Sequence, residues 1–458
     1  MKQIGRKSLA PLTGARFLAA LWVVLYHSTN DFGFQMSSQQ SEPILLALGN
    51  LIVRQGYLAV DFFFLLSGFI LSYNYITPDG KLRGGKRAFW VARIARIYPV
   101  YLLGIVLGAV EYLRDGHALA SATITIALHL LLVQSWIPAA LAFDLNPPAW
   151  SLAAEALFYA LFPLLLPLCA RFGRRSLPLV AGAAWGMYAL TLASFAVLGQ
   201  GLGFTSSSWL GAIVSFNPLV RLPEFLVGLA LGLAFVNSRR VEASSRRSRH
   251  LIVSSHDLGI AVALGALGAV FVLVPPITDH IPVANVMAVF AIPLFVLLIY
   301  LLAFQTGLFA WIFSLRLVAW LGEISYGIYI LHWPLWYLWH TYVTHMTHML
   351  PFKANSVWSL IIYLFLLVVT AGLSFKYLEG PTRRAIRAWW AKPKRVESDP
   401  SLVETVKLKR VEHAMPQPAE YDPTLVETVK LQAIPKPADP DPSLVETVKL
   451  RAIPNRFR

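Results

Sequence analysis

The chain has 458 residues, of which 57% are hydrophobic and only 14% are charged. This composition, with a mean hydropathy of +0.59, excludes an ordinary soluble domain, in which about a quarter of the residues are charged. The formal net charge of +15 does not indicate nucleic acid binding, because the basic residues cluster beside the ends of apolar runs, as they do in cytoplasmic flanks of membrane proteins. The single Cys169 excludes intrachain disulfides and Cys-based metal sites, and we expect it to be a small buried hydrophobe.

Apolar runs recur along the chain, and runs of about 18 to 22 residues are long enough to cross roughly 30 Å of hydrocarbon. The first run carries Arg16 and His27 and no cleavage motif follows it, so we expect a retained span rather than a signal peptide. The candidate spans lie near residues 12–30, 56–76, 97–114, 121–138, 149–170, 177–199, 217–237, 257–275, 283–304, 318–342 and 356–378.

The basic segments decide which loops are cytoplasmic. They lie at residues 81–96, 171–175, 238–250 and after Lys376. Placing all of them inside leaves one apolar run too many, so we expect either 97–114 or 121–138 to be re-entrant, or the two to form one crossing. The predicted fold class is therefore all-α, a polytopic transmembrane helix bundle of about ten spans with both termini in the cytoplasm.

The composition changes after Trp390 and predicts two regions, a transmembrane domain over residues 1–390 and a disordered cytoplasmic tail over 391–458. The tail repeats the sequence DPSLVETVKL, with one substitution in the second copy, at residues 399–408, 422–431 and 441–450. These repeats are either short peptides that bind a cytoplasmic partner or a neutral expansion without function.

Ionisable residues inside apolar spans are costly unless they are paired or hydrated, so each one is a candidate functional residue. Arg16 and His27 are eleven residues apart on the first span, which places them roughly 16 Å apart along one face of a helix. Asp61 on the second span has nearly the same depth as His27. We therefore expect either a catalytic Asp–His pair, in which His27 acts as a general base, or a structural hydrogen bond.

Further polar residues divide into two layers. Arg93 and Arg96 share one helix face at the cytoplasmic surface, where they could hold the phosphates of a nucleotide or anchor the helix to lipid headgroups. Glu155, Arg221 and Glu224 are expected in the outer half of the membrane, with His332 near its middle. This division suits a cofactor that enters from the cytoplasm and a reaction near or above the midplane.

Six motifs now occur in a recognisable order. They are Arg16 with His27, residues 56–61 with 66–69, residues 93–99, residues 148–152 with Glu155, residues 326–329 with His332, and residues 377–381 with Arg384. Together they make the chain resemble the membrane-bound acyltransferase 3 family over about residues 8 to 385. Many relatives carry an additional esterase-like domain outside the membrane, which we do not expect here.

The resemblance implies a bacterial inner-membrane enzyme that transfers an acyl group, most often acetyl from acetyl-CoA, to a hydroxyl of a glycan such as exopolysaccharide or lipopolysaccharide. It implies His27 as the essential histidine and Arg16, Arg93 and Arg96 as donor-binding residues. Asp61 and Glu155, which match recurrent acidic positions, complete the expected catalytic set, and Glu379 matches a third such position. The expected partners are the acyl-CoA donor, a glycan or lipid-linked sugar and membrane lipids, without a metal or nucleic acid.

Two other functions use the same residues. Buried His, Arg and Glu side chains also serve a transporter or flippase, although no inverted repeat is visible between the two halves of the sequence. A non-catalytic scaffold that assembles a complex through the tail repeats would lose function on truncation after Trp390 and tolerate His27→Ala. For an enzyme we expect the reverse.

Overall fold

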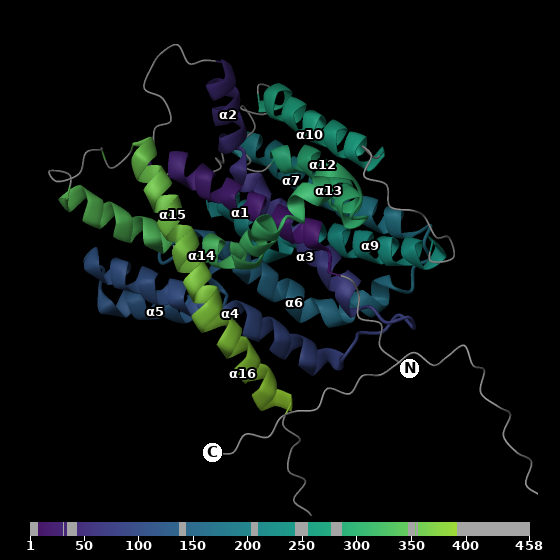
Figure 1. The fold of residues 1–458 in the computed structure, drawn as a ribbon, viewed down its shortest axis with the longest axis horizontal. Helices are drawn as coiled ribbons and strands as arrows, with labels where there is room; N and C mark the ends of the chain where they lie inside the picture. Colours follow the sequence, from purple (N-terminus) through teal and green to yellow (C-terminus); the bar gives the residue numbers. More distant parts are fainter. Residues whose placement is uncertain are drawn as a thin grey trace, which may run out of the picture. The chain divides into compact units, whose positions relative to one another are not determined.

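The computed structural model describes residues 8–30, 32–33, 44–136, 143–202, 209–242, 255–275, 286–346, 353 and 356–391, and the predicted tail with its three repeats lies outside them. The described part is helical, with a single isolated antiparallel bridge between Ile76 and Leu82. Its principal helices are α1 (Ala10–Asn30), α2 (Ile44–Arg54), α3 (Ala59–Tyr75), α4 (Gly85–Arg114), α5 (Leu119–Leu130), α6 (Trp150–Cys169), α7 (Leu177–Leu202), α8 (Trp209–Phe216), α9 (Pro218–Glu242), α10 (Ser255–Leu273), α12 (Val286–Ala303), α13 (Gly307–Phe313), α14 (Arg316–His345), α15 (Val357–Ser374) and α16 (Gly380–Ala391) (Figure 1).

The polytopic bundle predicted from the sequence is confirmed. Among the described residues, 8 helices are long and apolar enough to cross a membrane, or 9 when α13 and α14, which meet at a bend of 62°, count as one span. α1 is not in this set but has 21 residues, which is enough to cross roughly 30 Å of hydrocarbon. Large apolar side chains on α7 point outward, with Leu179 73% exposed and Leu190 68% exposed, as expected of a surface in contact with lipid.

Of the two ambiguous runs, 97–114 and 121–138, only the first belongs to a helix long and apolar enough to cross a membrane within the described residues. α4 is a continuous helix of 30 residues that includes Pro99, whereas α5 has 12 residues and is too short to cross alone. A single turn of helix at Gln134–Trp136 follows α5. The side chains of Gln134 and Ser135 donate hydrogen bonds to the carbonyl oxygens of Ala149 and Trp150 at the start of α6. These two bonds connect the irregular segment to α6, while the side-chain oxygen of Gln134 is buried without a hydrogen-bond partner within the described residues.

Small residues bring α3 and α9 into close contact. Gly228 and Gly232 of α9 are four residues apart, and a Cβ atom on either would collide with the backbone of Leu65 or Phe69 on α3. Gly68 on α3 is packed in the same way against the carbonyl oxygen of Phe225. This small-xxx-small pattern allows two helix backbones to approach each other in a membrane.

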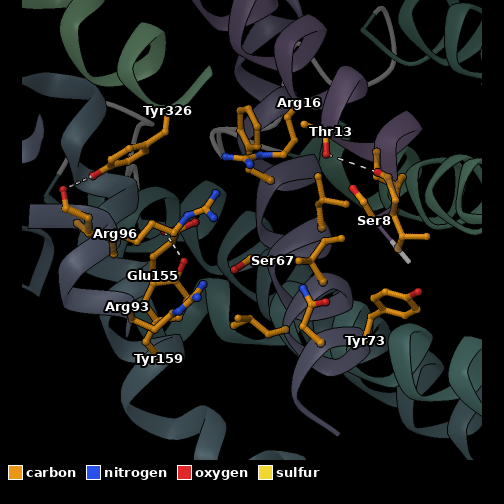
Figure 2. A pocket seen from close by; sticks show the side chains of 18 residues that line it. Ser8, Thr13, Arg16, Ser67, Tyr73, Arg93, Arg96, Glu155, Tyr159 and Tyr326 are labelled. Carbon is orange, nitrogen blue, oxygen red and sulfur yellow. Dashed lines mark hydrogen bonds between the residues drawn. The ribbon is translucent and has the colours of Figure 1, made fainter. Parts of the chain in front are cut away.

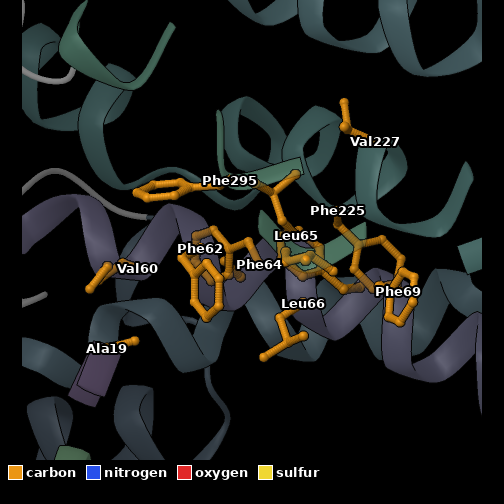
Figure 3. Close-up of a cluster of buried hydrophobic side chains, with 14 of the residues drawn as sticks. Ala19, Val60, Phe62, Phe64, Leu65, Leu66, Phe69, Phe225, Val227 and Phe295 are labelled. Carbon is orange, nitrogen blue, oxygen red and sulfur yellow. The ribbon is translucent and has the colours of Figure 1, made fainter. Parts of the chain in front are cut away.

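Aromatic side chains fill the interface between α3, α6 and α9. The ring of Phe158 on α6 lies 4.7 Å from that of Phe225 on α9 and 5.1 Å from that of Phe64 on α3, centroid to centroid. Figure 3 shows Phe62 and Phe64 of α3 gathered with Phe225 and with Phe295 of α12. Cys169 is buried at the end of α6.

α1 packs along α14, the pairing that positions the candidate site. Gly322 on α14 faces the backbone of Thr13, and Gly14 on α1 faces the backbone of Phe313 in α13, each with no room for a Cβ atom. Because the backbones are so close, the polar residues of α1 meet those of α14 directly.

Candidate active site

A cavity of about 300 Å³ opens between five helices. Its lining residues come from α3, α4, α6, α14 and α1 or the two residues before it: Ser8, Leu9, Leu12, Thr13, Arg16, Phe63, Leu66, Ser67, Ile70, Leu71, Tyr73, Asn74, Arg93, Arg96, Ile97, Glu155, Tyr159 and Tyr326. Figure 2 shows Arg16, Arg93 and Arg96 around the same space as Glu155. The structure therefore brings together four of the six residues predicted from the sequence.

The three arginines that line the cavity have no carboxylate at ion-pairing distance within the described residues. Arg93 donates a hydrogen bond to the hydroxyl of Tyr75 at 3.2 Å, and its guanidinium lies 5.5 Å from the centre of the same ring. Within the described residues, none of Arg16, Arg93 and Arg96 forms an ion pair at 4.0 Å or less. Half-buried guanidinium groups that lack carboxylate partners form a site suited to an anion.

Glu155 is the one carboxylate among the residues that line this cavity. The Tyr159 hydroxyl, one turn further along α6, donates a hydrogen bond of 2.9 Å to its Oε2 atom. The indole of Trp90 on α4 in turn donates to the carbonyl oxygen of Tyr159 at 3.0 Å. Three guanidinium groups and one carboxylate give the cavity an excess of two positive charges, counted from its lining residues.

A smaller cavity of about 50 Å³ continues from the first. The two share Arg16, Phe63, Glu155 and Tyr326 as lining residues, and the smaller one extends to Tyr329. The Tyr329 hydroxyl lies 2.8 Å from that of Ser151 and 2.9 Å from the carbonyl oxygen of Pro148, to which it donates. The polar space therefore extends along α14 to one turn before His332.

His27 lies beside His332, with 5.3 Å between the ring centroids. The ring of Trp333 also lies 5.3 Å from that of His27, at 90° to it. His332 is fully buried, and its Nδ1 atom is 2.6 Å from the carbonyl oxygen of Tyr329. Its Nε2 atom is buried without a hydrogen-bond partner within the described residues. His27 lines neither of the two cavities described above.

The structure does not form the hydrogen bond between Asp61 and His27 that their similar depth suggested. Asp61 Oδ1 instead accepts a hydrogen bond of 2.8 Å from Arg221, whose Nη1 atom also lies 2.8 Å from Glu224 Oε1 and 2.9 Å from the Tyr188 hydroxyl. The physical reason is the close packing of α3 on α9, which aligns Asp61 with Arg221 in a buried charged cluster.

Glu379 ends a π-helical segment, Phe375–Glu379, between α15 and α16. Its carboxylate is buried and lies 3.4 Å from Arg383 Nη2. One-turn π-helical insertions are frequent at functional sites, and Glu379 Oε1 has no hydrogen-bond partner within the described residues.

His332 was noted in the sequence but was not included in the expected catalytic set. The signal for it was present, because a histidine at mid-depth in a span is costly. What the sequence did not contain was the lateral contact between α1 and α14 that places it against His27. Arg221 and Glu224 were also noted in the sequence, but without Asp61 as their partner.

Comparison with known proteins identifies the family. Residues 10–376 match the family described as an acyltransferase domain. The chain is 32% identical to acyltransferase MdmB of Streptomyces mycarofaciens over 237 residues, which are 49% of this chain and 57% of that protein. It is 23% identical to the peptidoglycan O-acetyltransferase OatA of Listeria monocytogenes over 408 residues, which are 83% of this chain and 56% of that protein.

An O-acetyltransferase OatA of Staphylococcus aureus is likewise 23% identical over 395 residues, 84% of this chain and 58% of that protein. The chain thus spans just over half the length of these relatives. No solved structure matches it. Because the family match over residues 10–376 covers most of the sequence and includes all five helices that line the cavity, the chain belongs to the acyltransferase family.

Proposed function

We propose that this protein is an O-acetyltransferase of a bacterial inner membrane, which moves acetyl from acetyl-CoA to a hydroxyl of an extracytoplasmic or lipid-linked glycan. The observation that carries the proposal is the cavity of about 300 Å³ with three arginines that lack ion-pair partners within the described residues. Coenzyme A carries phosphate groups, and guanidinium groups bind phosphates through paired hydrogen bonds. The names of the matched OatA proteins support acetyl as the acyl group.

The orientation follows from the basic residues. Arg93 and Arg96 lie in the first half of α4, within the basic segment 81–96 that we assign to the cytoplasm. The cavity would then open toward the compartment that contains acyl-CoA, and both chain termini would be cytoplasmic. The tail repeats keep their two candidate roles, because no chemistry of the site depends on them.

The thioester end of the donor would point into the smaller cavity. With its phosphates on Arg93, Arg96 and Arg16, the donor would extend past Glu155 and Tyr326 toward Tyr329. His27, roughly 16 Å from Arg16 along α1, is the base that we assign to the reaction. Asp61, which lies on α3, would contribute through its ion pair with Arg221 and not through contact with His27.

In the direct mechanism His27 takes the proton of the acceptor hydroxyl as the oxygen attacks the thioester carbon. The new C–O ester bond forms, the C–S bond breaks, and the protonated His27 returns a proton to the departing thiolate. In the alternative relay His27 first carries the acyl group and then passes it to the acceptor. Both mechanisms place His27 at the reacting atoms.

The test is transfer of radiolabelled acetyl from acetyl-CoA to glycan in membranes that contain equal amounts of wild type, His27→Ala or Arg93→Ala. We expect label with wild type, a loss on the order of 10²-fold to 10⁴-fold with His27→Ala, and a higher donor requirement with Arg93→Ala. Arg87→Ala is the matched control, because Arg87 is exposed on the same helix and does not line the cavity. Equal transfer by His27→Ala and wild type would contradict the assignment of the base.

A further inference from the structure

We call the cavity of about 300 Å³ around Arg16, Arg93 and Arg96 the arginine cavity. A separate hydrophilic cavity, which we call the second cavity, lies near the other end of α4. It has about 120 Å³ and is lined by Gly108, Glu111, Tyr112, Asp115, His117, Asp144, Leu145, Pro334 and Tyr337. Arg96 and Glu111 are fifteen residues apart on one continuous helix, which corresponds to about 22 Å along its axis. The two cavities are therefore separated by much of the thickness of the hydrocarbon layer.

Along α14, His332, which lies beside His27 of α1, is between the residues that line the two cavities. Tyr326 lines the arginine cavity, His332 contacts His27, and Tyr337 lines the second cavity. A chain of ring contacts joins the second cavity to the pair, because Trp333 lies 5.3 Å from His27 and 6.4 Å from Tyr337 between ring centroids. A molecule bound in the second cavity is thus next to the residues that flank the proposed base.

Glu111 is the residue that indicates a ligand. Its side chain is only 8% exposed and lines the cavity, and within the described residues no donor forms a hydrogen bond with its carboxylate. The cation paired with it is Arg114, whose Nη1 atom is 3.9 Å from Oε2 and whose own side chain is 51% exposed. Because Glu111 lines the cavity, its carboxylate oxygens can accept hydrogen bonds from a molecule that occupies it. Hydroxyl groups of a bound molecule would supply the missing donors.

The rest of the lining defines the chemistry of that molecule. Asp115 and Asp144 add two carboxylates, and the ring of His117 stacks on Tyr112 at 3.9 Å between centroids. Burial raises the pKa of the Asp144 carboxyl, while His117 and a hydrogen bond from Tyr112 lower it. Within the described residues no three His, Cys, Asp or Glu side chains are placed to hold a metal ion. Carboxylates beside aromatic rings suit a polyol, with its hydroxyls on the acids and its C–H face on a ring.

We propose that this second cavity binds an uncharged sugar residue of the acceptor glycan, with Glu111 accepting hydrogen bonds from its hydroxyls and Tyr337 packing on its ring. The inference rests on the proposed transfer function and names the acceptor class for it. The three carboxylates disfavour a sugar that carries a uronate or phosphate at this position, because like charges repel in a poorly hydrated site. Gly108, packed against the backbone of Leu145, holds the 143–146 segment in place as one wall.

The experiment compares Glu111→Gln and Tyr337→Ala with two controls. Arg114→Gln breaks the same ion pair as Glu111→Gln but leaves the carboxylate, and Asp79→Asn removes an exposed carboxylate elsewhere. Each full-length protein is assayed for acetyl transfer to glycan in membranes, and each purified protein for coenzyme A binding. We expect both cavity variants to lose at least tenfold in transfer at fixed donor, with unchanged coenzyme A affinity and near-wild-type activity in both controls.

Each result decides the inference. If Glu111→Gln and Tyr337→Ala transfer acetyl at the wild-type rate, the inference is overturned while the transferase function stands. The same holds if Arg114→Gln loses as much transfer activity as Glu111→Gln. Tyr337→Phe, which keeps the ring, should restore transfer and shows that a loss is not misfolding. If wild type itself transfers no label, the proposed function fails. In that case the binding of a neutral tetrasaccharide and of a uronate tetrasaccharide is measured with purified wild type and Glu111→Gln. This measurement tests the sugar site independently of acetyl transfer. If wild type does not bind the neutral tetrasaccharide, the inference is overturned.

Discussion

The imidazole rings of His27 and His332 lie 5.3 Å apart on two helices, α1 and α14, that pack closely because Gly322 leaves room for the backbone of Thr13. A carbonyl oxygen only accepts hydrogen bonds, so the short contact of His332 Nδ1 with Tyr329 places a hydrogen on that nitrogen. In the neutral ring Nε2 then keeps a lone pair, and this atom has no partner within the described residues. His332 is therefore fixed in one tautomer beside the proposed base.

We expect His332 to position His27 rather than to contact substrate. His332→Leu should lower the turnover number on the order of tenfold or more, with little change in the KM for donor. His332→Gln, which retains a hydrogen-bond acceptor, should recover part of the loss. The measurement is steady-state acetyl transfer at varied acetyl-CoA, with His345→Gln, an exposed histidine on the same helix, as control. A KM effect with unchanged turnover would contradict the positioning role.

The donor site should respond to charge and to the shape of the cation. Loss of a charged hydrogen-bond partner costs about 1.5 to 3 kcal/mol, so Arg93→Ala and Arg96→Ala should each weaken coenzyme A binding on the order of tenfold to a hundredfold. Arg93→Lys should recover only part of this, since an ammonium group cannot form the paired hydrogen bonds of a guanidinium. Calorimetric titration of the purified protein measures both effects. The same affinity in Arg93→Ala and wild type would place the phosphates elsewhere.

The buried cluster of Arg221, Asp61 and Glu224 predicts unequal effects of removing its members. Arg221→Met leaves two carboxylates beside each other without a cation, and breaking a buried pair in this way costs about 3 to 5 kcal/mol. Asp61→Asn still leaves one carboxylate on Arg221, because Glu224 Oε1 lies 2.8 Å from the same Nη1 atom. We therefore expect a larger fall in thermal midpoint for Arg221→Met than for Asp61→Asn in detergent solution. The reverse order would show that Asp61 contributes more to the stability of the cluster than its geometry indicates.

The close contact between α3 and α9 predicts that adding one methyl group at this interface lowers the stability of the protein. A Cβ atom on Gly228 would collide with the backbone of Leu65, whereas the space beside Gly182 on α7 is empty to 4 Å. We expect Gly228→Ala to destabilise the protein by about 1 to 3 kcal/mol. Gly182→Ala should be neutral or stabilising by roughly 1 kcal/mol, because alanine favours the helix. Thermal unfolding of the two purified variants tests the difference, and equal stabilities would contradict the close approach.

The helical bundle and the pairing of Arg93 with Arg96 could be predicted because both follow from one-dimensional patterns. Apolar run length predicts a span, and a spacing of three residues places Arg93 and Arg96 on one face. Arg16 was grouped with these two residues by the resemblance to the acyltransferase 3 family and not by a spacing. All three line the cavity in the structure.

Lateral neighbours could not be predicted in this way. Asp61 and His27 have similar depth, but depth does not define which helix a side chain faces. The glycines of α9 draw that helix onto α3 and bring Arg221 to Asp61, while α14 supplies His332 to His27. For the segment 97–138 the sequence left two arrangements open, since a helix of 12 residues such as α5 resembles a span until its ends are known.

The uninterrupted length of α4 has a consequence for energy coupling. If the donor occupies the cavity at one end of this helix and the acceptor the cavity at the other, only the two-carbon acyl unit passes between compartments. The coenzyme stays on the side where it is made and recharged. The free energy of thioester cleavage would then drive a modification in a compartment that has no supply of activated acyl groups, without the export of a carrier.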